Sequence, residues 1–360
     1  PSCYSLPGVI QFTSGENRDC PEKFEAMNIK AGISTVSRQG GKWKTLVSAF
    51  TVAMALSGCA TDFQYPSVIE NRPDFLPQSY TLSDLPYFAA TETESGAGPL
   101  TSLLAATGLS TALPSEIAPM LYEQQSPTTF QTDVRTTIRS FGLIPYPLAP
   151  RLIDVVVEIA SGNPVLALQG SGGIGTQWSY VLVKGYDFDR ELMIVNTASG
   201  ENVELPLREF ERRWVAGNRQ SVMAVAPGQL PTTADAADYH AALSALQQID
   251  ATDPELEAAY QRGLEEWPED RNLLMGFGQY LMDSGQYFQA SDVFSETMNL
   301  YPGFGMAHNN MARALIELGR LDEARFHANE AVATDDEFNE VYVQTLEVIN
   351  RRARSANRSN

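Results

Sequence analysis

The chain has 360 residues, of which 43% are hydrophobic and 19% charged, a composition typical of a globular protein long enough for two domains. Its formal net charge is −19 at pH 7. This acidic balance argues against nucleic acid and anionic lipid surfaces as partners, because both repel negative charge.

Residues 1–58 have the features of a targeting leader. Basic residues up to Lys44 precede an apolar run over 45–56, which is too short to span a bilayer comfortably. The run ends in a Leu-Ser-Gly-Cys sequence that resembles a bacterial lipobox, so we expect Cys59 to be acylated and to become the new N-terminus. Met27 is the predicted start of translation. The alternatives are an ordinary signal peptide or a buried hydrophobic segment.

The residue after the predicted lipidation site indicates the destination. Ala60 stands where an aspartate would resemble an inner-membrane retention signal. The resemblance therefore implies a lipoprotein of the bacterial outer membrane that faces the periplasm and is anchored through Cys59. Cys3 and Cys20 precede Met27, so we expect no disulfide in the mature chain.

Residues 59–79 are polar and contain three prolines, which predicts a linker between membrane and first domain. Residues 80–228 are predicted to form a mixed α/β domain, with a hairpin turn at Asp187–Arg190. The predicted helices span 98–107, 114–123, 132–141, 152–160 and 207–214, and the predicted strands span 165–169, 179–184, 192–195, 203–205 and 222–226.

A linker at 229–237 precedes a helical repeat domain at 238–353. Gly285 and Gly319 are 34 residues apart, and so are Ala290 and Ala324. The glycine permits a tight turn between two antiparallel helices, and the small alanine lets those helices approach closely. This pattern resembles tetratricopeptide repeats, and residues 337–352 are expected to form a terminal capping helix.

Two signatures in the first domain resemble those of the bacteriocin-processing, double-glycine-type cysteine peptidases, which are papain-like. One is the Gly-Ala-Gly-Pro sequence at 96–99, which opens a helix, and the other runs over 179–187 and ends in Gly-Tyr-Asp. With the lipobox and the repeats, the chain resembles a lipoprotein subgroup of that family. The resemblance implies an α+β papain-like domain followed by an all-α tetratricopeptide-repeat solenoid.

The reactive residues of that family are missing from this chain. By resemblance, Ala97 occupies the position of the cysteine nucleophile, Ser179 that of the histidine base, and Asn196 that of the residue that orients the base. No cysteine or histidine lies between Ala60 and Tyr239. Alanine cannot attack a peptide bond and serine cannot replace an imidazole, so we expect a catalytically degenerate pseudopeptidase.

The first helix of each repeat is expected to line a concave face that binds peptides or partner helices. The alternative is that the repeats only pack against the first domain. The histidines of the repeats have no metal-ligand spacing, so no metal and no cofactor are expected. The side chains predicted to line the groove are Asn272, Met275, Gln279, Asn309 and Arg313.

These features predict a protein that binds a peptide or protein partner without cleaving it. Two alternatives remain open. One is an active peptidase of the same family that works by an unrecognised mechanism. The other is a structural scaffold or assembly factor for envelope or surface polymers.

Overall fold

The computed structural model describes residues 63–90, 96–108, 111–121, 127–171 and 177–359. The predicted leader, Met27 and the predicted lipidation site Cys59 lie outside these ranges. None of the helices within them has both the length and the hydropathy needed to cross a membrane.

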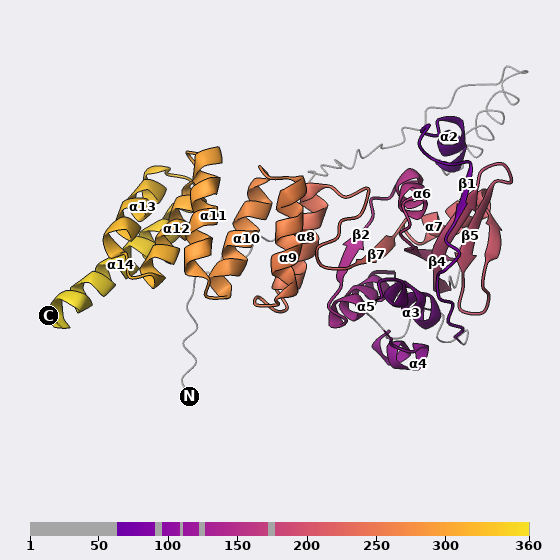
Figure 1. Ribbon diagram of the computed structural model, residues 1–360, viewed down its shortest axis with the longest axis horizontal. Helices are drawn as coiled ribbons and strands as arrows, with labels where there is room; N and C mark the ends of the chain where they lie inside the picture. The colour runs from indigo at the N-terminus through magenta and orange to yellow at the C-terminus, as the bar shows by residue number, and fades with distance from the viewer. Residues whose placement is uncertain (1–62, 91–95, 109–110, 122–126, 172–176, 360) are drawn as a thin grey trace, which may run out of the picture. The chain divides into compact units, whose positions relative to one another are not determined.

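An antiparallel sheet organises the first part of the described chain (Figure 1). Its strand order is β2-β7-β3-β4-β5-β6, with β1 also paired to β4. The bounds are β1 Ser79–Thr81, β2 Ile144–Pro147, β3 Val165–Gly170, β4 Trp178–Asp187, β5 Leu192–Asn196, β6 Val203–Pro206 and β7 Ser221–Val225. All residues of β3 are buried, because helices cover both faces of the sheet there.

The helices of this part are short, and they divide between the two faces. Helix α3 packs on one face, and α6 and α7 pack on the other (Figure 1). Their bounds, with those of the remaining helices of this part, are α2 Tyr65–Glu70, α3 Ala97–Ala106, α4 Pro114–Ile117, the 3₁₀ turn η2 Ala118–Met120, α5 Pro127–Ser140, α6 Leu152–Ala160 and α7 Leu207–Ala216. All five predicted strands are present, and α6 has the predicted bounds.

The predicted linker at 59–79 is folded from Phe63 onward, which corrects the sequence-based expectation. The backbone N–H groups of Gln64 and Tyr65 donate to the carboxylate of Glu211, at 2.7 and 2.9 Å. Glu211 is fully buried in α7. Because these bonds satisfy donors at the start of α2, they dock this helix onto the domain.

Helices continue from α8 to the C-terminal part of the chain, and successive helices lie side by side (Figure 1). Their bounds are α8 Ala236–Gln247, α9 Glu255–Glu266, α10 Arg271–Asp283, α11 Tyr287–Leu300, α12 Gly305–Glu317, α13 Leu321–Ala333 and α14 Asn339–Ser359. The helical repeat and its terminal helix are thereby confirmed as an all-α region.

The 34-residue period corresponds to repeated turns and repeated close contacts. Gly285 and Gly319 have φ values of +73° and +74° at the turns that follow α10 and α12. Ala290 and Ala324 are fully buried in the helices that come next. A left-handed backbone favours glycine, and a buried methyl group allows close helix packing, so both halves of the predicted pattern have a structural cause.

Candidate functional site

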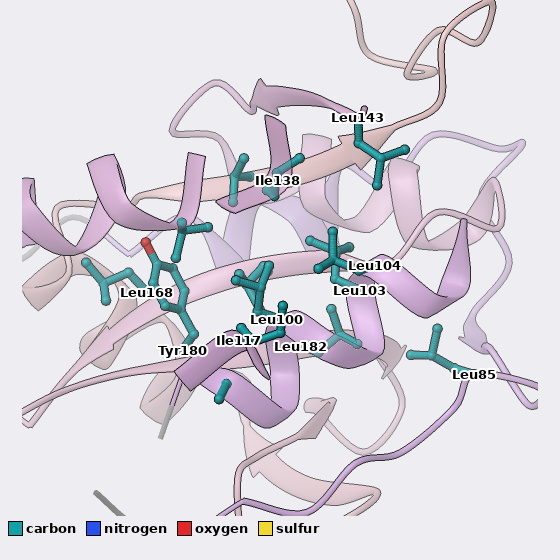
Figure 2. Close-up of a cluster of buried hydrophobic side chains, with 14 residues drawn as sticks. Leu85, Leu100, Leu103, Leu104, Ile117, Ile138, Leu143, Leu168, Tyr180 and Leu182 are labelled. Carbon is teal, nitrogen blue, oxygen red and sulfur yellow. The ribbon is translucent and has the colours of Figure 1, made fainter. Parts of the chain in front are cut away.

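Ala97, the predicted nucleophile position, begins α3 and is fully buried. It belongs to a hydrophobic cluster that joins α3 to the central strands. Figure 2 shows Leu100, Leu103 and Leu104 of α3 within this cluster, together with Leu182. A methyl group sealed in such a cluster offers no reactive atom, and it does not line an accessible cleft.

Ser179, the predicted base position, lies on the opposite face of the sheet. Tyr180 and Leu182 belong to the cluster that contains Ala97, and side chains alternate along a strand. Ser179 therefore points away from Ala97. Its cross-strand partner Gln169 donates to the carbonyl of Phe210 in α7 at 3.4 Å, which confirms the direction. The alternation of small and large residues in β4 was the sequence signal that could have revealed this.

Asn196, the predicted orienting residue, does lie on the face of α3. It is directly opposite Leu182 in the β4–β5 pair, and directly paired residues share a face. Asn196 is fully buried; its Oδ1 accepts from the backbone N–H of Asn202 at 2.9 Å. Within the part of the chain that the structure describes, its Nδ2 has no hydrogen-bond partner. A buried donor of this kind costs about 1–3 kcal/mol.

The three predicted positions thus do not form one constellation. The sheet separates Ser179 from Ala97, and only Asn196 shares the face of Ala97. A basic side chain on the same strand, Lys184, is also buried, with its Nζ 4.0 Å from Glu201 Oε1. Among the described residues, the predicted positions Ala97, Ser179 and Asn196 therefore offer no pair of nucleophile and base.

A polar cluster joins the first helices of successive repeats. Arg313 of α12 donates through Nη1 to Gln279 Oε1 of α10 at 3.4 Å and to Asn310 Oδ1 at 3.3 Å. Gln279 also donates to Asp283 Oδ1 at 2.7 Å. We call Gln279, Asp283, Asn309, Asn310 and Arg313 the Arg313 cluster.

Burial dominates the electrostatics of the cluster. Desolvation lowers the pKa of Arg313, although Asp283 and Glu317 oppose the shift. Desolvation also raises the pKa of Asp283, against the hydrogen bonds from Gln279 and Gln247. The opposite charges of Arg313 and Asp283 offset part of the desolvation cost of each side chain. The Arg313 cluster can therefore lie between apolar helices.

One member of the cluster keeps an unused acceptor. Asn309 is 2% exposed, and its Nδ2 donates to Asn310 Oδ1 at 3.4 Å. Among the described residues, its Oδ1 has no hydrogen-bond partner.

Two of the predicted groove residues lie elsewhere. Met275 is 6% exposed and forms part of the core, because α10 contacts α8 as well as α9 and α11. Asn272 is exposed at the start of α10 and lines a separate pocket of about 570 Å³ with Trp267 and Tyr301. Helical register identified the correct helices but not how deeply each position is buried.

Two histidines that sequence spacing did not connect meet in the last repeat. His308 lies on α12 and His327 on α13, and their Nδ1 atoms are 3.2 Å apart. In the part of the chain that the structure describes, no group of three or more His, Cys, Asp or Glu side chains could hold a metal. The third histidine, His240, contacts Ser244 on its own helix.

No family model matches the sequence, and no curated protein matches it. Among solved structures, the chain is similar to the TPR domain of Sgt2 from Aspergillus fumigatus, with 16% identity and a TM-score of 0.32 over 35% of this chain and 83% of the other. It is also similar to a protein described as a C39-like peptidase from Bacillus anthracis, with 14% identity and a TM-score of 0.33 over 41% of this chain and 97% of the other. These likenesses support no statement about activity.

Proposed function

We propose that the protein is a non-catalytic binding protein, in which a pseudopeptidase domain is joined to tetratricopeptide-like repeats that hold a peptide or protein partner. Its body faces the periplasm from an outer-membrane lipid anchor at Cys59. The observation that carries the proposal is the Arg313 cluster, a polar surface built across the first helices of the repeats. The unpartnered oxygen of Asn309 lies within it.

The burial of Ala97 favours the repeats over the old peptidase centre as the binding surface. A ligand at α3 would have to displace the leucines around Ala97, whereas Gln279 and Arg313 of the Arg313 cluster are only partly buried and already hydrogen-bond each other. Preorganised polar groups lower the cost of ordering on binding. The preferred ligand is a segment in extended or helical conformation that offers N–H donors to Asn309 and acceptors to Arg313.

The experiment is affinity capture from detergent-solubilised membranes, using the full chain, Asn309→Leu and the control Arg325→Ala. Arg325 lies on α13 and pairs with the exposed Asp322, away from the cluster. We expect a specific partner with the wild type and with the control, and loss of that partner with Asn309→Leu. A partner recovered equally by all three chains would contradict a role for the Arg313 cluster.

A further inference from the structure

Two imidazoles from neighbouring helices face each other in the repeat that carries Asn309 and Arg313. The Nδ1 atoms of His308 and His327 are 3.2 Å apart, their ring centroids are 5.4 Å apart, and the rings are tilted by 35°. We propose that these imidazoles bind a divalent transition-metal ion of the zinc, nickel or copper class. This site lies apart from the proposed peptide-binding function and does not depend on it.

The separation of the two nitrogens suits such an ion. Zinc binds imidazole nitrogen at about 2.0–2.1 Å, so two nitrogens of a tetrahedral site lie about 3.3 Å apart. In the metal-free pair, one Nδ1–H donates to the other Nδ1. A modest rotation of the rings would direct the Nδ1 lone pairs of both histidines to a common point, where the metal ion would lie. The proton on the donating Nδ1 then moves through solvent to Nε2 of the same ring, so both imidazoles remain neutral.

The preceding repeat shows what these positions hold without a ligand. One period earlier, 308 − 34 gives Leu274 and 327 − 34 gives Val293. Leu274 is 2% exposed and packs in the core. An apolar pair is therefore sufficient for packing at these positions in one repeat. The next repeat has histidine, a common metal ligand, at both positions.

A backbone carbonyl also contacts the ring of His308. His308 also hydrogen-bonds the backbone of Pro302, which has only a carbonyl to offer, so the imidazole donates there. Metal-ligating histidines commonly donate a ring N–H to a backbone carbonyl in this way, which fixes the ring.

Water can complete the coordination, because no third His, Cys, Asp or Glu side chain of the described residues joins the pair. Both rings are half-buried, so solvent reaches the pair. Imidazole ligands favour zinc, copper and nickel over magnesium and calcium, which prefer oxygen.

The test is calorimetric titration of ZnCl₂ into the full chain and into His308→Leu/His327→Val, which carries the residues of the preceding repeat. The three cysteines are alkylated in both proteins so that thiolates do not bind the metal. We expect one zinc ion in the wild type that the double variant lacks, or binds at least about 10-fold more weakly. We expect no binding of MgCl₂ to either protein.

Equal zinc stoichiometry and affinity in both proteins would overturn the proposal, and so would the absence of zinc binding by the wild type. If the double variant loses its helical circular dichroism, the electron paramagnetic resonance spectrum of Cu²⁺ bound to the wild type decides whether both imidazoles bind the ion. Coupling to two imidazole nitrogens supports the site, and coupling to one or none contradicts it.

Discussion

One buried carboxylate, that of Glu211, contributes to the docking of α2 beside the side-chain hydrogen bonds of Gln64 to Pro150 and Leu152, and this gives a sharp prediction. Glu211→Gln keeps the side-chain volume but replaces one acceptor oxygen with an NH₂ group that faces a backbone N–H. Two hydrogen bonds, from Gln64 and Tyr65 at 2.7 and 2.9 Å, are affected. Arg219, 3.6 Å from Glu211 Oε1, also loses its charged partner.

The expected cost follows from the loss of one hydrogen bond to a charged acceptor, about 1.5–3 kcal/mol. Because about 1.4 kcal/mol is a tenfold change in an equilibrium constant, opening of α2 should become about 10- to 150-fold more frequent. Hydrogen–deuterium exchange of residues 63–71 measures this directly. Global unfolding in urea, followed in parallel, separates local opening from loss of the fold.

Glu209→Gln is the matched control. Glu209 lies two residues earlier on α7 and pairs with Arg212 and Arg213 at the surface, at 2.7 and 2.6 Å. Its replacement should leave exchange in residues 63–71 unchanged. If Glu211→Gln also leaves that exchange unchanged, the reasoning that this carboxylate docks α2 is refuted.

Three further predictions concern the core, the repeats and the histidines. Ala97→Cys/Ser179→His should not create peptidase activity on a peptide library, because the two side chains lie on opposite faces of the sheet; measurable turnover would refute that placement. Gly278→Ala should destabilise the chain in urea by about 1–3 kcal/mol, since its Cβ would lie 2.3 Å from the ring of Phe294, whereas Gly303→Ala, which meets nothing within 4 Å, should change stability little. Burial lowers the pKa of all three histidines below their ordinary 6.5. As the pH falls through that value, the unfolded chain therefore binds more protons than the folded chain. The urea midpoint should therefore be lower at pH 5.5 than at pH 7.5, and an unchanged midpoint would contradict the shifts.

Much of the architecture could be predicted because its determinants are local. The turn glycines Gly285 and Gly319 and the buried alanines Ala290 and Ala324 recur with one period, and each has a local reason to be there. The strands around β4 are likewise marked by apolar runs between breaker residues. Such signals do not depend on knowing the tertiary partners.

What could not be predicted depends on contacts between distant parts of the chain. The sequence of residues 63–79 predicts a linker because their partner, Glu211, lies more than 140 positions away. Met275 is polarisable and flexible enough for a groove, and the packing of α10 between its neighbouring helices leaves it buried. The pairing of His308 with His327 needed the geometry of the helix hairpin.

The placement of Ser179, in contrast, could have been predicted, because the alternation of small and large residues along β4 is visible in the sequence. Matching a motif position by position assigns Ser179 to the base, but a strand whose even-numbered residues Tyr180 and Leu182 enter the core must turn its odd-numbered residues away. A resemblance to a motif therefore identifies the matching strand more securely than it identifies the face of the sheet on which a given side chain lies.

The central claim, binding without cleavage, is tested most directly by incubating the purified full chain with its captured partner and following the mass of that partner over time. The account predicts that the partner stays intact and stays bound, because the position predicted for the nucleophile is the buried Ala97 and the position predicted for the base, Ser179, lies on the other face of the sheet. New fragments of defined mass, produced by the wild-type chain in proportion to its concentration, would contradict it.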